Sequence, residues 1–217
     1  MNFEKIFYVG LHKTGTTSFH RFLLNAGLSS VHCPGHFEGT DYQKLVDAAG
    51  DDDERILDCF QPLLRRFTGF SDVPIAGVYK GLAQRYPTAK FVMFTRDLND
   101  WWRSLHQHWS LAVVSRCLSP FERAQYKNYL GFDRQFIRAC DRTTMIEAHV
   151  RHISEVRSFL TGREFLDVDL KDPQVGPKLA HFLKLPDAAL PREKLMNPLL
   201  RTKRIFKNVS QRFASST

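Results

Sequence analysis

The chain has 217 residues, 43% of them apolar, which is enough to bury one sizeable core. Its formal net charge of +8 indicates acidic partners, but no basic stretch interleaved with aromatic residues and no zinc-finger pattern occurs, so nucleic acid is not an expected partner. No apolar run approaches the roughly 18 to 20 residues of a membrane span, and the start of the chain lacks the features of a signal peptide, so we expect a cytoplasmic protein without an integral membrane segment.

Short apolar runs alternate along the chain with stretches of helical periodicity. The runs predict strands at "KIFYVG" (5–10), "LSSVHC" (28–33), "GFSDVP" (69–74), "AKFVMFTR" (89–96) and "REFLDVDL" (163–170). The periodic stretches predict helices at 16–24, 51–67, 75–86, 98–114 and 175–183, with mostly helical structure between 114 and 160. Pro62 is expected to kink or split the helix at 51–67.

This alternation is typical of the α/β class. It predicts three layers, with a central parallel sheet flanked by helices, a helix-rich C-terminal half and ligands at the carboxyl ends of the strands. Because no repeat or low-complexity linker interrupts the pattern, we expect a single domain over residues 1–217, with a basic C-terminal segment at 192–217.

The stretch "GLHKTGTTS" (10–18) joins the first predicted strand to the first predicted helix. Gly10 and Gly15 have the spacing of the G-x-x-x-x-G-K-[ST] phosphate loop, but Thr16 stands in the lysine position and the nearby Lys13 precedes the second glycine. A glycine-rich turn between a strand and a helix directs backbone N–H groups and the positive end of the helix dipole at one point, which is an anion site. Further donors would be the hydroxyl groups of Thr14, Thr16, Thr17 and Ser18.

The same stretch resembles the 5′-phosphosulfate loop of sulfotransferases that use 3′-phosphoadenosine 5′-phosphosulfate (PAPS). In that family the loop reads K-x-G-[ST]-[ST], and an arginine at a strand end is followed eight residues later by a serine on the next helix. Arg96 and Ser104 in "FVMFTRDLNDWWRSL" have that spacing, and the resemblance covers roughly residues 5 to 105, with a weaker likeness in "FLDVDLKDPQVGPKLAHFLKLP". It implies a P-loop fold with PAPS as co-substrate. The nucleotide-binding residues that it implies are His12, Lys13, Thr14, Gly15, Thr16, Thr17, Ser18, Arg96 and Ser104.

The resemblance also implies a reaction without a metal ion. P-loop enzymes that use ATP hold Mg²⁺ with the loop Ser/Thr and an acidic residue at the end of another strand, whereas the strand at 89–96 ends in Arg96. Lys13 would neutralise the oxygen that bridges sulfur and phosphorus as that bond breaks, which is stabilisation made mainly in the transition state. The four cysteines lack C-x-x-C spacing, which argues against a zinc site.

Asp72 is the expected catalytic base. In the cytosolic members of the family a catalytic histidine stands at a strand end, two residues before a proline and a little over twenty residues before the 3′-phosphate arginine. Asp72 holds the matching place relative to Pro74 and Arg96, and a carboxylate there can accept the proton of a hydroxyl group. Two alternatives are that Asp72 only caps the helix after Pro74 and that His36 is the base. His32, His106 and His108 are also near enough to the motifs in sequence to line the site.

The acceptor is left open by the sequence, because no sugar or phenol pocket is recognisable. Phe70 stands where the cytosolic members carry a lysine, so a carbohydrate, a lipid or a small-molecule hydroxyl are all candidates. The segment from Arg192 to Arg212 carries seven Lys or Arg residues and one Glu. It is interpreted as a terminal helix, which could contact a nucleotide phosphate or weakly bind an anionic membrane surface.

Two other functions fit part of the pattern. A metal-dependent P-loop kinase would also use Gly10, Gly15 and Thr17, with Asp72 or Asp169 as the magnesium ligand, but the displaced lysine and the arginine after the strand count against it. A non-catalytic protein that binds a nucleotide or an acidic glycan would keep the loop and the basic surface without needing the base.

Overall fold

The computed structural model of the protein describes residues 5–111, 117–131 and 140–191. The predicted basic segment at 192–217 lies outside these residues. The described elements alternate as the sequence predicts. In chain order they are β1 (Ile6–Tyr8), α1 (Thr16–Asn25), β2 (Ser30–His32), β3 (His36–Phe37), β4 (Thr40–Asp41), α2 (Tyr42–Ala49), α3 (Asp53–Cys59), α4 (Gln61–Arg66), β5 (Gly69–Ser71), η1 (Ile75–Gly77), α5 (Tyr79–Arg85), β6 (Lys90–Thr95), α6 (Leu98–Leu111), α7 (Pro120–Leu130), α8 (Arg142–Phe159), β7 (Phe165–Asp169) and α9 (Val175–Leu183).

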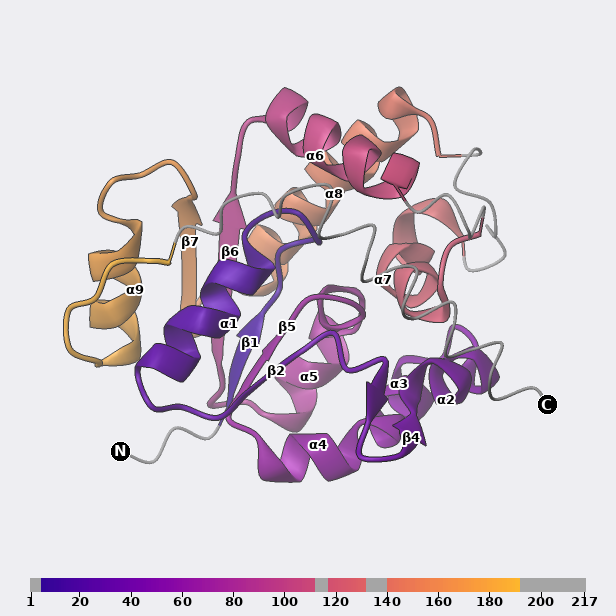
Figure 1. Ribbon diagram of the computed structural model, residues 1–217, viewed down its shortest axis with the longest axis horizontal. Helices are drawn as coiled ribbons and strands as arrows, with labels where there is room; N and C mark the ends of the chain where they lie inside the picture. The colour runs from indigo at the N-terminus through magenta and orange to yellow at the C-terminus, as the bar shows by residue number, and fades with distance from the viewer. Residues whose placement is uncertain (1–4, 112–116, 132–139, 192–217) are drawn as a thin grey trace.

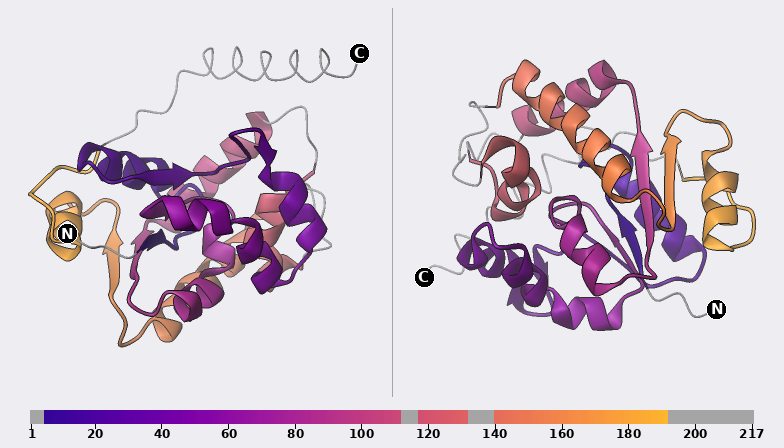
Figure 2. Two further views of the ribbon diagram at one scale, coloured as in Figure 1. Left: turned by 90° about the horizontal axis from the view of Figure 1, so that it is seen from below. Right: turned by 180° about the vertical axis from the view of Figure 1, so that it is seen from behind.

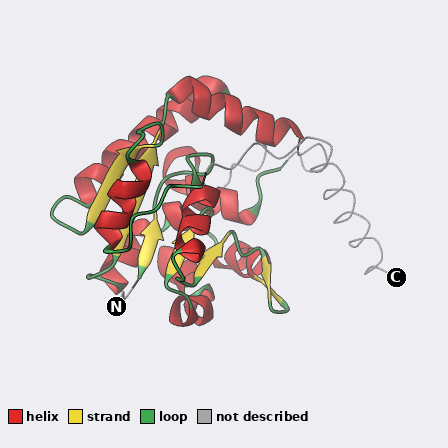
Figure 3. Cartoon of the chain, turned by 60° about the vertical axis from the view of Figure 1, so that its left-hand side comes forward, coloured by secondary structure: helices red, strands yellow, loops and turns green. Residues whose placement is uncertain are grey.

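The five predicted strands form one parallel sheet in the order β2-β5-β1-β6-β7, with helices on both faces (Figures 1 and 3). This confirms the predicted α/β class and three-layer arrangement. Since all five strands run in the same direction, their carboxyl ends meet at one edge of the sheet. That edge carries the loop between β1 and α1, the segment after β5 and the segment after β6.

The alternation of side chains along β1 explains the two covering layers. Successive side chains of a strand point to opposite faces, so Phe7 and Val9 pack with α5 and α8 while Ile6 and Tyr8 pack with α1 and α9. The view from behind shows α5 and α8 across one face of the sheet (Figure 2). Fully buried aromatic rings of this kind contribute much of the apolar area removed from water.

A third apolar cluster joins α6, α7 and α8 beside the carboxyl edge of the sheet. Trp101 on α6 and Met145 on α8 are fully buried in it, together with Leu11 of the loop after β1. The loop is therefore packed against the helical half of the molecule, not exposed as a flexible turn. None of the described helices has the length and apolar character needed to cross a bilayer.

One helix prediction is confirmed and one needs correction. The stretch 51–67 is split into two helices, as Pro62 predicts: α3 ends at Cys59 and α4 begins at Gln61, with Pro62 in the first turn of α4, where a missing N–H group costs least. The stretch 75–86 begins as the 3-10 turn η1 and becomes α-helical only in α5. Helix α2 and the β3–β4 hairpin before it were not predicted, because these short elements give weak periodic signals.

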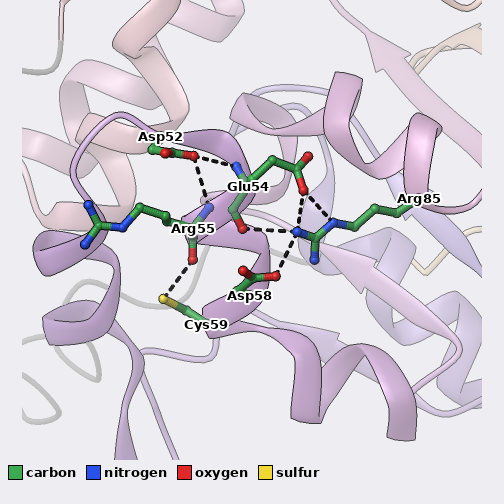
Figure 4. Close-up of polar contacts among 6 residues, drawn as sticks. All are labelled: Asp52, Glu54, Arg55, Asp58, Cys59 and Arg85. Carbon is green, nitrogen blue, oxygen red and sulfur yellow. Dashed lines mark hydrogen bonds and ion pairs between the residues drawn. The ribbon is translucent and has the colours of Figure 1, made fainter.

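An acidic residue, Asp52, caps the start of α3. The Asp52 carboxylate accepts hydrogen bonds from the backbone N–H groups of Glu54, at 2.9 Å, and Arg55, at 3.1 Å (Figure 4). Arg85 of α5 reaches the same helix and donates to the carboxylates of Glu54 and Asp58. These exposed ion pairs add little stability individually, so they mainly orient α3 against α5.

Close packing of η1 against α7 supports the segment after β5. A Cβ atom at Gly77 would overlap the carbonyl oxygen of Ala124 and lie 2.6 Å from the Cα atom of Gln125. Because both are backbone atoms, the two elements would have to separate. We expect Gly77→Ala to lower the free energy of unfolding by about 1 to 3 kcal/mol in urea denaturation. Val150→Ala, at an exposed position of α8, should change it by less than about 0.5 kcal/mol, and equal midpoints for the two variants would contradict this packing.

Candidate active site

The loop between β1 and α1 adopts the sharp turn that its glycines permit. Gly15 is the N-cap of α1, with φ 105°, and Lys13 has φ 70°, so both lie in the left-handed region. Glycine adopts this conformation without steric cost, whereas for lysine it costs roughly 1 kcal/mol. Non-glycine residues in this region persist where the surrounding structure fixes them, and they gather at binding sites.

Side chains from behind the loop fix its carbonyl groups. Arg96 Nη1 donates to the carbonyl oxygen of Lys13 at 2.9 Å, and Trp101 Nε1 donates to that of His12 at 3.1 Å. His152 Nε2, on α8, lies 2.7 Å from the carbonyl oxygen of Val9. These contacts hold the loop carbonyls, while the first N–H groups of α1 have no acceptor within the helix and are available to an anion.

Thr14 does not present its hydroxyl group to this anion site. Its side chain is fully buried and its Oγ1 donates to the carbonyl oxygen of Leu11. The same Oγ1 lies 2.9 Å from the hydroxyl group of Tyr8. The prediction of Thr14 as a hydroxyl donor is therefore wrong for its side chain, because the turn points it into the core, where it closes the loop on itself.

A cavity of about 990 Å³ lies at the carboxyl edge of the sheet. It brings together most of the predicted site residues from four separate parts of the chain. Those that line it are His12, Lys13, Gly15, Thr16, Thr17, Ser18, Asp72, Arg96 and Ser104. Thr14 and His36 are not among the residues that line it.

Arg96 and Ser104 reach the cavity from β6 and α6. Arg96 follows the last residue of β6, and Ser104 lies on the second turn of α6, so both face the opening beside the loop. Asp100, on the first turn of α6, also lines the cavity and pairs with Lys171 at 2.8 Å. The Lys171 ammonium group holds the pKa of the Asp100 carboxyl below its usual range.

Asp72 stands directly after β5 with φ 73° and points into the same cavity. Its side chain is 17% exposed, and its Oδ1 atom is buried without a hydrogen-bond partner among the described residues. The capping alternative is not supported, since η1 has no side-chain cap and only the backbone carbonyl of Asp72 accepts from Ile75. The Oδ1 atom is therefore available to accept a proton.

His36 lies on β3, outside the cavity. Its side chain is 63% exposed, and its Nε2 is 3.7 Å from the carboxylate of Asp41 across the β3–β4 hairpin. The hairpin pairs His36 with Asp41, and the His36 side chain faces solvent. The alternative in which His36 is the base therefore has no structural support, and His106 likewise does not line the cavity.

His32 and His108 are the histidines outside the phosphate loop that do line the cavity. His32 is the last residue of β2, and its Nε2 lies 3.3 Å from Asp72 Oδ2. The sequence placed it near the motifs but gave it no role. Its position at the end of a predicted parallel strand could have identified it, because β2 pairs with β5 and brings His32 opposite Ser71, the neighbour of Asp72.

His12 is 4% exposed and contributes to the cavity wall. Its Nδ1 lies 2.9 Å from Gln125 Nε2 and 3.0 Å from the hydroxyl group of Tyr126, while its Nε2 is buried without a partner among the described residues. Burial lowers the pKa of His12 well below its usual value, and the nearby His108 and Lys13 add to this effect. His12 is therefore a neutral imidazole at physiological pH.

The described residues contain no group of three or more His, Cys, Asp or Glu side chains placed to hold a metal ion. Of the two carboxylates considered as magnesium ligands, Asp72 lines the cavity and Asp169 does not. Asp169 is exposed at the end of β7, where it accepts a hydrogen bond from the backbone N–H group of Lys171 at 2.7 Å.

Two solved structures share this architecture. A sulfotransferase from Alicyclobacillus acidocaldarius is 19% identical, with a TM-score of 0.52 over 92% of this chain and 88% of that chain. A shikimate kinase from Bacteroides thetaiotaomicron is 14% identical, with a TM-score of 0.51 over 83% of this chain and 98% of that chain. Both have P-loop folds, and at these identities the likeness establishes the fold alone.

No significant match to a curated protein sequence was found. The sulfotransferase domain family, in contrast, matches residues 5–195, a span that contains the loop, the cavity and every described strand. The chain therefore belongs to the sulfotransferase domain family.

Proposed function

We propose that the protein transfers the sulfuryl group of PAPS to an acceptor hydroxyl group, without a metal ion. The observation that carries the proposal is that Lys13, Asp72, Arg96 and Ser104, which come from separate parts of the chain, all line one cavity. In this proposal the loop and the start of α1 bind the 5′-phosphosulfate, and Arg96 and Ser104 bind the 3′-phosphate. A planar guanidinium group suits bidentate recognition of a phosphate.

The bound nucleotide supplies an activated sulfuryl group, and the chain supplies a base and a cation. The acceptor oxygen forms a bond to sulfur, and its proton passes to the carboxylate of Asp72. The bond between sulfur and the bridging oxygen breaks, and its electron pair stays on the departing phosphate oxygen. Lys13 neutralises the charge that develops there, so its effect is greatest in the transition state.

The kinase alternative has one structural resemblance in its favour, the shared fold of the shikimate kinase. It requires an acidic magnesium ligand beside Thr17, and Asp72, the candidate ligand that lines the cavity, is already in contact with His32. The cation after β6, Arg96, stands where a P-loop kinase would place a magnesium-binding acid. A binding protein without catalysis would share the cavity but would show no transfer.

Thermal shift measurements separate these functions at low cost. We expect the desulfated nucleotide, adenosine 3′,5′-bisphosphate, and PAPS to raise the melting temperature, because a ligand that binds only the folded state stabilises it. ATP with magnesium should give a smaller shift at equal concentration. A larger shift with ATP and magnesium would contradict the proposed function. Radiolabelled PAPS, offered with a panel of a sugar, a phenol and a long-chain alcohol, then tests transfer directly.

Arg96→Ala should weaken the binding of adenosine 3′,5′-bisphosphate by about 1.5 to 3 kcal/mol, the range for hydrogen bonds to charged groups. The measurement is isothermal titration of the wild type and the variant. Since Arg96 also donates to the carbonyl oxygen of Lys13, part of the loss would come from the loop.

Adenosine 5′-monophosphate provides the control for that second effect. Damage to the loop weakens both nucleotides equally, whereas loss of the 3′-phosphate contact weakens only the bisphosphate. The preference of the wild type for the bisphosphate should therefore shrink in Arg96→Ala and, to a smaller extent, in Ser104→Ala. An undiminished preference in both variants would show that another group binds the 3′-phosphate.

A further inference from the structure

The imidazole of His32 connects the phosphate loop to the proposed base. Its Nε2 lies 3.3 Å from the Oδ2 atom of Asp72 and 3.3 Å from the hydroxyl oxygen of Thr17. Its Nδ1 lies 3.1 Å from the hydroxyl oxygen of Ser71, the β5 residue opposite His32 in the sheet register. One ring therefore contacts the end of β5, the first turn of α1 and the residue that follows β5.

The ring is held in place on its other side. His20 of α1 stacks on His32 with the ring centroids 5.4 Å apart and an angle of 22° between the planes. His20 Nδ1 in turn lies 2.8 Å from the hydroxyl oxygen of Ser30 on β2. Stacking fixes the plane of the His32 ring, so its two nitrogens have fixed partners.

The charge of Asp72 decides which nitrogen of His32 carries the proton. An ionised carboxylate at 3.3 Å repels the lone pair of a bare Nε2 and attracts an N–H group. Ser71 can donate its hydroxyl proton to the bare Nδ1. The neutral ring with the proton on Nε2 satisfies Asp72 and Ser71 together, and the other tautomer does not.

We infer that His32 is a positioning residue for the reaction: its Nε2–H group faces the Asp72 carboxylate, holds it in the orientation in which it accepts the proton, and links it to Thr17 of the phosphate loop. This inference rests on the proposed function, in which Asp72 is the base. It adds a residue that neither binds the nucleotide nor accepts the proton of the acceptor hydroxyl group. Thr17, with its oxygen facing Nε2, keeps its own hydroxyl proton to donate into the cavity.

The charged groups around His32 agree with a neutral ring. The groups that face it are Asp72 after β5, Lys13 of the loop, and His20 of α1. Burial is the largest influence and lowers the pKa of His32, Asp72 opposes this effect, and Lys13 adds to it. Burial likewise lowers the pKa of His20, to about 4, so neither ring brings a positive charge at physiological pH.

Three substitutions at His32 separate positioning from simple packing. The amide nitrogen of Gln occupies nearly the place of Nε2, that of Asn nearly the place of Nδ1, and Phe keeps only the ring. We expect His32→Gln to keep turnover within about fivefold of the wild type, and His32→Asn and His32→Phe to lose about 10- to 100-fold, the usual scale for an orienting partner of a reacting group. The dissociation constant of adenosine 3′,5′-bisphosphate should stay within about threefold in all three.

The pH profile is a readout that packing alone would not move. A hydrogen-bond donor stabilises the charged form of a carboxylate, so the carboxylate stays ionised to a lower pH. A substitution of His32 that removes the donor should therefore let the base become protonated at a higher pH. The acidic limb of kcat/KM should therefore move to higher pH in His32→Asn and His32→Phe, and remain near the wild-type position in His32→Gln. Equal loss of turnover in all three variants, with no movement of the limb, would overturn the inference in favour of a packing role.

Long-range ¹H–¹⁵N spectra of the full chain test the tautomer without any acceptor. The His32 signals, assigned by their absence in His32→Gln, should show a protonated Nε2 and a bare Nδ1 at neutral pH. A protonated Nδ1 would contradict the inference even in an inactive protein. Failure of the wild type to transfer sulfuryl groups or bind the bisphosphate would reject the proposed function instead, and normal turnover in His32→Phe beside an inactive Asp72→Asn would reject the role of His32 alone.

Discussion

Asp72→Asn is expected to lower turnover by about 10²-fold or more, the usual scale for a lost general base. The amide keeps the shape of the carboxylate but cannot accept the proton of the acceptor hydroxyl group. The substituted side chain makes no capping bond in the structure, so thermal stability should be nearly unchanged. The affinity for adenosine 3′,5′-bisphosphate should also be nearly unchanged. Initial rates with radiolabelled PAPS, together with melting curves and titrations, test all three statements.

Asp169→Asn is the matched control for this substitution. Asp169 is also an aspartate directly at the end of a parallel strand, but it is exposed and does not line the cavity. Its loss should leave turnover close to that of the wild type. If Asp169→Asn were inactive and Asp72→Asn active, the base would be wrongly assigned and the carboxylate at the end of β7 would take part in the reaction. Near-normal turnover in Asp72→Asn with an inactive His32→Phe would instead identify the imidazole as the base.

Lys13→Ala should lower kcat by about 10²- to 10³-fold, the cost of removing one group that stabilises charge in a transition state. Its effect on the affinity for adenosine 3′,5′-bisphosphate should be smaller, because the leaving oxygen carries its full charge only as the bond to sulfur breaks. Comparison of single-turnover rates with dissociation constants separates the two effects. A loss confined to affinity would mean that Lys13 only binds the nucleotide.

Two controls accompany the Lys13 measurement. Lys178→Ala removes a lysine of α9 that pairs with Asp172 and does not line the cavity, so it should leave turnover unchanged. The wild type should also transfer at full rate in the presence of a chelator, since in the proposed reaction Lys13 and Arg96 supply the positive charge that magnesium supplies in P-loop kinases. An absolute requirement for a divalent ion would favour the kinase alternative.

The sequence predicted the sheet well because each strand is marked by a local property. The five runs of apolar residues became the five parallel strands, and glycines placed the loop after the first of them. The spacing of Arg96 and Ser104 was sufficient to place both at one cavity, since a strand followed by a helix fixes their separation. Short elements such as α2 and the β3–β4 hairpin were missed because they contain too few residues for a periodic pattern.

The prediction of side-chain directions was less successful. Thr14 belongs to the same motif as Thr16 and Thr17, and the motif gives no reason to separate them. In the structure, the left-handed angles at Lys13 and Gly15 turn the Thr14 hydroxyl group into the core. His36 is close to the motifs along the chain, but the hairpin that it belongs to places it in solvent.

The sequence by itself determined the α/β class and the phosphate loop, because each depends on residues that are near one another in the chain. Its resemblance to the sulfotransferases added Lys13, Asp72, Arg96 and Ser104 as candidate site residues. Only the tertiary structure decided which histidine meets Asp72. His32 and Asp72 are separated by a hairpin and three helices, and they meet because β2 pairs in parallel with β5 and aligns His32 with Ser71. Strand pairing acts between residues that are distant in sequence, so no local pattern of residues records it.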